Sequence, residues 1–207
     1  MATDTLVLGI GNVLWADEGF GVRAVAALNA GWQFPESVTL MDGGTLGLYL
    51  LPHVQAARRL LVFDAVDYQL EPGTLHVLKD GDIPTYLGVG KMSLHQSSFQ
   101  EVLSLAQFSG QSPQSAVLVG VQPKVLMDFG GSLTDPVRNR LPEALAAGLA
   151  ILAEWGVPGV PRERAATDSL MDASLDLGAY EGGRPGSDEA CRVGDARFLA
   201  IRRAAGG

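Results

Sequence analysis

The sequence predicts an α/β fold, a three-layer sandwich around a mostly parallel β-sheet. Short, continuous apolar runs, which are typical of buried parallel strands, alternate along the chain with segments of helical periodicity. The chain has 207 residues, of which 47% are hydrophobic. One domain of this size can bury a substantial core without disulfides, so disorder is not expected to be its main state.

The predicted strands share one pattern, an apolar run that stops at a glycine or a polar residue. The run at 59–64 is the clearest of them, because it reads Arg-Leu-Leu-Val-Phe-Asp with no polar residue inside. Strands that alternate with helices favour a parallel sheet, since parallel neighbours need a crossover connection. The five predicted strands are 5–11, 37–41, 59–64, 73–78 and 116–121.

Four segments have the periodicity of helices. The first opens with Asp17 and Glu18, and the helix dipole favours acids in a first turn. Ser93-Leu-His-Gln96 has the spacing of a capping box, and Pro142 occupies a favoured first-turn position. The predicted helices are 17–28, 47–54, 93–108 and 142–155.

The regular alternation stops near residue 160. Residues 1–160 are expected to form the domain, and 161–207 a poorly ordered or loosely docked C-terminal tail, because its segment 181–188 has the composition of a linker. Inside the domain, a loop of about fifteen residues spans 80–94, and loops of this length in compact domains are often functional.

The charge balance argues against nucleic-acid and membrane partners. The chain carries 15 Lys and Arg against 23 Asp and Glu, a net charge of −8, and nearly all of the acidic excess lies in residues 1–160. Binding to phosphate polymers or to anionic lipids needs the opposite sign. A cation or a basic partner suits this surface better.

The cysteine count and the apolar runs bear on the cellular location. A single cysteine, Cys191, leaves no intrachain disulfide and no cysteine-rich metal site. The N-terminus lacks the basic region of a signal peptide. The longest apolar run, 144–153, is about half of the roughly 20 residues that a membrane helix needs. A cytoplasmic protein is expected.

Polar side chains follow several of the predicted strands. In doubly wound sheets ligands bind beyond the carboxyl ends of the strands, so these residues are candidates for a site. Two carboxylates and one imidazole would make a three-ligand metal site with open positions, able to polarise a carbonyl or to activate water. For each residue alone, an ordinary helix-end or strand-end role is the alternative. The candidates are Asn12, Asp17, Glu18, Asp42, Asp64, Asp67 and His95.

Nucleotide binding is a second interpretation of the same region. Gly9-Ile-Gly11 begins a dinucleotide fingerprint, and Asp42 follows the second strand, where a ribose-binding acid would lie. However, Leu14 replaces the third glycine, and Asp17 and Glu18 would repel a pyrophosphate. The metal interpretation therefore accounts for more of the residues.

Other catalytic patterns are missing from the sequence. It contains no Gly-x-Ser-x-Gly elbow, no His-Glu-x-x-His motif and no P-loop. Cys191 falls in the predicted tail, away from any base. His53 falls in a predicted helix and His76 in a predicted strand, and no chemistry is expected of either.

Five motifs, in order and at similar spacing, resemble those of the nickel-dependent maturation endopeptidases of [NiFe] hydrogenases. The longest is the glycine-rich segment 9–23, Gly-Ile-Gly-Asn-Val-Leu-Trp-Ala-Asp-Glu-Gly-Phe-Gly-Val-Arg. The resemblance covers about residues 4–160, and details of the tail and motifs are similar to the uptake-hydrogenase branch. The other four motifs are Asp42-Gly-Gly-Thr45, Phe63-Asp-Ala-Val66, Ser93-Leu-His-Gln96 and Gly120-Val-Gln-Pro123.

This resemblance implies a twisted sheet of about five strands with helices on both faces. It implies an endopeptidase that clips a C-terminal extension from the hydrogenase large-subunit precursor after nickel insertion. The family's metal-binding positions fall on Glu18, Asp64 and His95. Asp42 falls on a position associated with substrate recognition or cleavage, an aspartyl protease-like role. Nickel is the implied cofactor, supplied by the client subunit.

Several alternatives stay open at this point. A non-catalytic chaperone that checks the same subunit for its metal would present the same ligands in its sequence. Nickel could serve hydrolysis or only recognition of the client. The resemblance gives the tail at 161–207 no role, and it leaves the oligomeric state open, with a monomer favoured.

Overall fold

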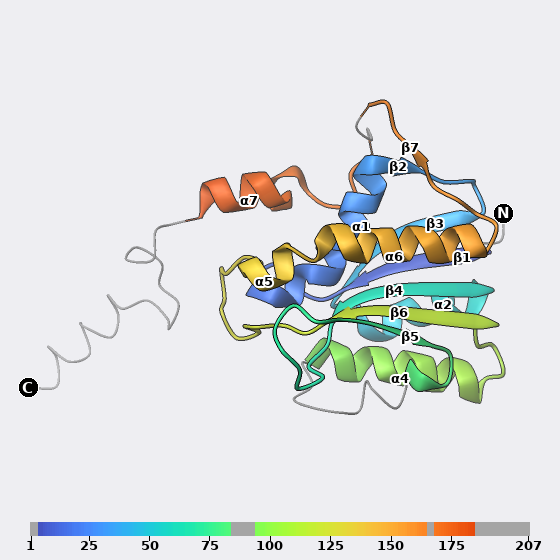
Figure 1. Ribbon diagram of the computed structural model, residues 1–207. Coiled ribbons are helices and arrows are strands. Elements are labelled where there is room, and N and C mark those ends of the chain that lie inside the picture. The colour runs from blue at the N-terminus through green and yellow to red at the C-terminus, as the bar shows by residue number, and fades with distance from the viewer. Residues whose placement is uncertain (1–3, 84–93, 165–167, 185–207) are drawn as a thin grey trace, which may run out of the picture.

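A five-stranded sheet forms the centre of the computed structural model, which describes residues 4–83, 94–164 and 168–184, without the side chains of 94–98 (Figure 1). The strand order is β3-β1-β4-β6-β5. The first four strands run parallel, and β5 runs antiparallel to β6. The predicted α/β sandwich is therefore confirmed. The strands are β1 (Thr5–Ile10), β3 (Val38–Gly44), β4 (Arg59–Ala65), β5 (Leu75–Lys79) and β6 (Ser115–Val121).

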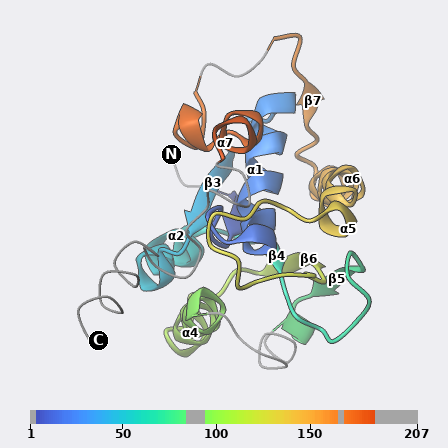
Figure 2. The same ribbon diagram turned by 90° about the vertical axis from the view of Figure 1, so that its left-hand side faces the viewer.

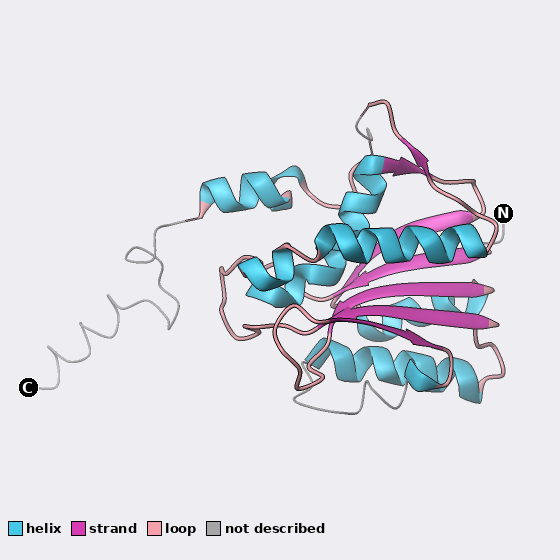
Figure 3. Ribbon diagram, in the orientation of Figure 1, coloured by secondary structure: helices cyan, strands magenta, loops and turns pink. Residues whose placement is uncertain are grey.

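Helices cover both faces of this sheet (Figure 3). On one face lie α1 (Phe20–Gly31) and α6 (Leu141–Glu154), and on the other lie α2 (Leu51–Ala56) and α4 (Leu94–Phe108). Alternate residues of β4 pack on opposite faces of the sheet. Leu61 and Phe63 pack with α1 and α6, whereas Leu60 and Val62 pack with α2 and α4. This burial on both sides explains why the strands are continuous apolar runs.

Two short 3₁₀ helices precede α1 and α2: η1 (Ala16–Gly19) and η2 (Gly47–Leu50). Asp17 and Glu18 therefore belong to η1, and not to the first turn of one continuous helix as the sequence predicts. The α-helix itself begins at Phe20, directly after η1. The two acids are thus held in the connection between β1 and α1.

Glycines allow α1 to approach the sheet closely. A Cβ atom on Gly9 would lie 2.3 Å from the carbonyl oxygen of Gly21. A Cβ atom on Gly21 would lie 2.1 Å from the carbonyl oxygen of Phe63 and 2.3 Å from that of Ile10. Real Cβ atoms cannot come this near, so packing against the sheet explains glycines that otherwise suggest a nucleotide fingerprint. It also brings η1 to the end of β4.

The chain beyond α6 returns along α1. A two-stranded antiparallel pair joins β2 (Trp32–Gln33) to β7 (Val160–Pro161). The short helices η3 (Ala173–Leu175) and α7 (Leu177–Gly183) then lie beside α1, past the carboxyl ends of the strands (Figures 1 and 2). The predicted boundary at residue 160 stays a prediction. In the ranges given above, no helix combines the length and the apolar character that crossing a membrane requires.

Candidate functional site

The carboxyl ends of the parallel strands carry the candidate site, seen end-on in Figure 2. Asp42 lies in β3 and pairs with Gly9 of β1, while Asp64 lies in β4 and pairs with Gly120 of β6. Glu18 enters from η1, which contacts β4. Residues far apart in sequence thus converge on one edge, as the topology predicts.

Glu18 is a buried carboxyl group, with 8% of the residue exposed. Its burial raises its pKa from 4.5 to about 7, because the charged form loses its hydration. A tight turn holds it there: Gly11 has a φ of +126°, and a Cβ atom on it would lie 1.8 Å from the Glu18 carbonyl oxygen. Only glycine can occupy that position.

Asp64 is buried even more completely, with 1% of the residue exposed. Its Oδ1 accepts a hydrogen bond from the backbone N–H of Ala65 at 2.8 Å. η1, which carries Glu18, contacts β4, and Gly21 just after it packs on the Phe63 carbonyl at this strand end. Two acids from different elements, Glu18 and Asp64, are therefore held in the same buried region.

Asp17 has a different role from its neighbour, because four hydrogen bonds from the loop after β6 satisfy its carboxylate. The side chain is fully buried. Oδ2 accepts from the backbone N–H groups of Lys124 and Val125, both at 2.9 Å, and from the Thr134 hydroxyl at 3.0 Å. Oδ1 accepts from the Thr134 N–H at 2.7 Å. Asp17 thus ties the loop 124–134 to η1.

Asp42 is half-buried at the end of β3. Burial raises its pKa, whereas a hydrogen bond from the Gly44 backbone and the positive charge of Arg23 lower it. The fold itself requires glycine at the two positions that follow Asp42. A Cβ atom on Gly43 would lie 2.8 Å from Ile10 Cδ1, and Gly44 has a φ of +42°. The positions of both glycines after Asp42 are thus explained by the fold of this strand end.

Three polar residues at this edge have structural roles. Asn12 Oδ1 accepts a hydrogen bond from the Leu14 N–H at 3.0 Å, which closes a turn. The buried Gln122 accepts from the backbone N–H of Tyr68 at 2.8 Å and donates to Asp67 Oδ1 at 3.0 Å. Gln122 therefore links the ends of β4 and β6. In the sequence it stands out only as a member of the motif Gly120-Val-Gln-Pro123.

Comparison with known proteins identifies the family. Residues 22–151 match the family described as hydrogenase maturation protease. The chain belongs to this family. It is 58% identical to the hydrogenase expression/formation protein HupM of Azotobacter chroococcum mcd 1 over 195 residues, 94% of this chain and 93% of HupM. It is 42% identical to the hydrogenase 2 maturation protease of Escherichia coli (strain K12) over 159 residues, 76% of this chain and 96% of that protein.

The fold comparison agrees with this assignment. The solved structure of the hydrogenase maturating endopeptidase HybD from E. coli has a TM-score of 0.73 and 39% identity, and the match covers 77% of this chain and 98% of HybD. The hydrogenase maturation protease family predicted from the five motifs is thus confirmed, and the protein is a hydrolase. The match to HupM covers 195 of the 207 residues, so it extends over η3 and α7.

His95, the third predicted ligand of this maturation protease, lies in the first turn of α4. Its side chain is outside the described residues, as are Cys191, Ser93 of the predicted capping box and most of the loop 80–94. In the part of the chain that is described, no group of three or more His, Cys, Asp and Glu side chains is placed to hold a metal ion. His53 lies in α2, and His76 of β5 packs against the Tyr68 ring at 5.1 Å.

Exposed apolar side chains flank the carboxyl edge of the protease. After β3, Leu48 and Tyr49 of η2 face solvent, and Tyr49 is 82% exposed. After β6, Met127 and Phe129 are exposed, and the Phe129 ring packs edge-on against Trp15 with centroids 5.5 Å apart. Large apolar groups at a site's rim are suited to holding a peptide.

Proposed function

We propose that this protease removes a C-terminal extension from the large-subunit precursor of a [NiFe] hydrogenase, of the uptake branch, after nickel has been inserted. Glu18, Asp64 and His95 would bind the client's nickel, and Asp42 would act in cleavage. Family membership supports the peptidase activity. The observation that best supports the site is the pair of buried carboxyl groups, Glu18 and Asp64, at the carboxyl edge of the sheet.

The donor set fits a divalent transition metal. Carboxylate oxygen and imidazole nitrogen together suit first-row metals such as nickel. Burial raises the pKa of Glu18, and a cation beside it would stabilise the charged form. Nickel is part of the substrate in this proposal. Three protein ligands leave further coordination positions for groups of the client.

Such a site would make processing wait for metal insertion. A precursor without nickel brings no ion for Glu18 and Asp64, so it would bind more weakly. Glu18, whose pKa burial raises, would then favour its protonated form. The loaded precursor would stabilise the charged form, and the protease would thereby distinguish the two precursors.

Asp42 is the proposed proton-transfer group. Burial raises the pKa of Asp42, and the Gly44 hydrogen bond and the charge of Arg23 offset part of that rise. In the ionised state it can accept a proton from the attacking water and return it to the leaving amine. Nickel, when bound, supplies a Lewis acid close to the scissile carbonyl. The exposed side chains of Tyr49 and Phe129 would hold the client peptide on either side.

The test is to incubate the protease with a large-subunit precursor, nickel-loaded or nickel-free, and to weigh the client by mass spectrometry. Loss of a C-terminal peptide from the loaded client only, abolished by His95→Ala, is the expected result. Asp42→Asn should abolish cleavage while nickel-dependent binding of the client persists. Glu143→Gln is the matched control, because Glu143 lies on the outer surface of α6, in an exposed ion pair with Arg140.

Other outcomes would contradict the proposal. Equal cleavage of the loaded and the nickel-free client would remove nickel from the mechanism. An unchanged mass of a correctly loaded cognate client, with binding that still depends on nickel, would indicate a checkpoint chaperone. Affinity for NAD or ATP that does not depend on His95 would favour the nucleotide-binding interpretation. Full activity of Asp42→Asn would exclude Asp42 from the reaction.

A further inference from the structure

The segment 172–184, which we call the clamp, is fastened to the protease by side chains of its own. Asp172 and Asp176 cap its two short helices by accepting the N–H groups of Ser174 and Gly178, at 2.9 and 3.0 Å. Because local capping forms both helices, the clamp presents a defined surface. That surface lies beside α1 at the carboxyl edge of the sheet (Figure 2).

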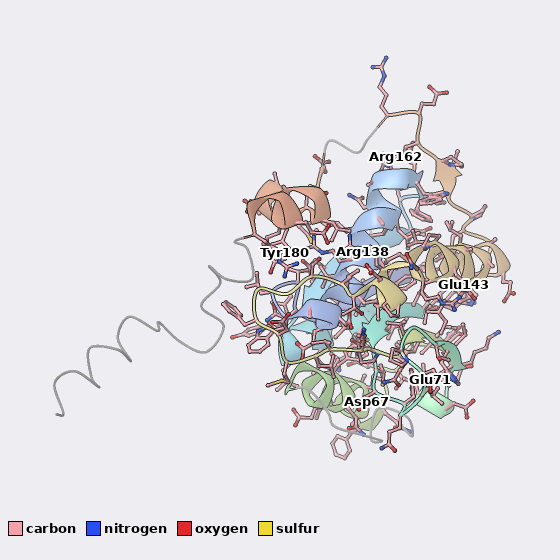
Figure 4. All side chains as sticks on the ribbon, turned by 60° about the vertical axis from the view of Figure 1, so that its left-hand side comes forward. Asp67, Glu71, Arg138, Glu143, Arg162 and Tyr180 are labelled. Atoms are coloured by element: carbon pink, nitrogen blue, oxygen red, sulfur yellow. The ribbon has the colours of Figure 1, made fainter. Side chains whose placement is uncertain are left out.

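Glu181 of the clamp makes the strongest connection to the rest of the protein. Arg138 of α5 (Asp135–Arg138) donates to both of its carboxylate oxygens, and the Nη1–Oε2 distance is 2.9 Å. Ser132 donates its hydroxyl to Oε1 at 2.5 Å. These bonds lower the pKa of Glu181 to about 2, so the pair stays charged at every working pH. Figure 4 shows Tyr180 and Arg138 together between α7 and the body of the protein.

Arg23 of α1 contacts the clamp. Its side chain is buried, with 5% of the residue exposed, and its Nη1 donates to the carbonyl oxygen of Leu175. The Tyr180 ring covers its guanidinium at 5.4 Å, and the Tyr180 hydroxyl donates to the Gly131 carbonyl at 3.3 Å. A guanidinium buried this deeply needs such partners to offset lost hydration.

The helix that carries Arg23 also packs close to Asp42, because Gly9, which pairs with Asp42, packs on the backbone of Gly21, two residues before Arg23. The positive charge of Arg23 opposes the effect of burial on the Asp42 carboxyl. Besides Asp42, the charged and titratable groups around Arg23 are Asp176, Tyr180 and Glu181 of the clamp, together with Arg138. Most of the environment that holds Arg23 in place is thus supplied by residues 172–184.

We propose that the clamp positions Arg23 near the end of β3 that carries Asp42, and that the C-terminal segment is therefore a working part of the site. Arg23 is a positioning residue in this scheme. Through it, residues far down the chain set the electrostatic environment of the proposed cleavage group. The inference rests on the proposed function, because it is through Asp42 that the clamp would influence cleavage.

Point variants in the full-length chain test each link. Glu181→Gln removes the charge that binds Arg138, so the bidentate Arg–carboxylate pair is lost. Amide hydrogen exchange across 173–183 should therefore become about tenfold faster. Tyr180→Leu removes the ring over Arg23. Both variants, and Arg23→Gln, should raise the pKa of Asp42, measured by carboxyl ¹³C NMR and assigned with Asp42→Asn. Arg23→Lys keeps the charge and should restore part of the effect.

Glu143→Gln again serves as the control, because it removes an ion pair of the same type that has no contact with the clamp. It should leave both the exchange rates at 173–183 and the Asp42 titration unchanged. Exchanging the charges, with Arg138→Glu and Glu181→Arg together, should recover most of the protection that either single variant loses.

Failure of this inference can be told from failure of the proposed function. An Asp42 titration that is the same in wild type, Arg23→Gln and Tyr180→Leu would overturn the inference, whatever the protease does to its client. Unchanged exchange at 173–183 in Glu181→Gln would also overturn it. Both readouts need no client and no nickel. A wild-type protein that leaves a loaded cognate client uncut fails the proposed function, while the NMR result still stands.

Discussion

Glu18 makes protein stability depend on pH in a direction that can be tested. Its pKa is 4.5 in an ordinary environment and about 7 in the folded protein, because the site buries it. Below the lower value the group is protonated in both states and contributes nothing. Between the two values the folded state holds an extra proton, so stability falls as the pH rises. Above the upper value the full penalty applies.

The magnitude follows from the size of the shift. At about 1.4 kcal/mol per pH unit, the change corresponds to roughly 3 kcal/mol at most. Glu18→Gln replaces the group with a neutral one of the same shape. We therefore expect this variant to be more stable than wild type by roughly 3 kcal/mol at about pH 8, and by less than about 1 kcal/mol near pH 5. For a chain of this size, the melting temperature at about pH 8 should rise by roughly 5–10 °C.

Urea unfolding of both proteins at several pH values measures this difference directly. Comparing wild type with the variant cancels the contribution of every other titrating group. Glu143→Gln should show no such trend, since Glu143 is exposed. A stability difference that is the same at low and high pH would refute the reasoning, because it would mean that the Glu18 carboxyl is hydrated in the folded state.

Three further substitutions, with Gly31→Ala as a control for one of them, test the framework around the site, all by urea unfolding. Asp17→Ala should destabilise by about 3–5 kcal/mol, because it leaves three N–H groups, at the two ends of the loop 124–134, without their acceptor. Gly21→Ala should cost at least about 3 kcal/mol or prevent folding, since its methyl group would strike two carbonyl oxygens. Gly31→Ala, in the same helix with nothing within 4 Å, should be neutral or stabilising by up to about 1 kcal/mol. Gln122→Leu should cost about 2–3 kcal/mol, because two N–H groups lose their acceptor.

The sheet could be predicted because its strands are buried on both faces. A strand covered by helices on each side must be apolar at every position, and this leaves an unmistakable run such as 59–64, observed as Arg59–Ala65. Pattern alone does not give strand direction, so the antiparallel β5 could not be distinguished from its parallel neighbours. The pair of β2 and β7 was out of reach, because two residues show no periodicity.

The site could be predicted only as a set of positions. The rule that ligands bind beyond the carboxyl ends of strands gives seven candidates, and only the resemblance to the family singles out Glu18, Asp42, Asp64 and His95. The partners of Asp17 and Arg23 could not be found in this way. Asp17 is bonded to residues more than a hundred positions away, and the partners of Arg23 come from the segment expected to be a loose tail. Contacts of such long range depend on the completed fold.

Asp17 and Glu18 show how one dipeptide separates structure from function. Both acids are buried in η1, yet Asp17 receives four hydrogen bonds, and Glu18 carries a pKa raised by burial. The first acid makes the turn rigid, and the second is held by that turn in a place where its charge is disfavoured. A side chain that only stabilised the fold would be better protonated, amidated or apolar here. The proposed metal role predicts this difference, because a cation brought by the client would stabilise the charged form of Glu18, whose pKa burial raises.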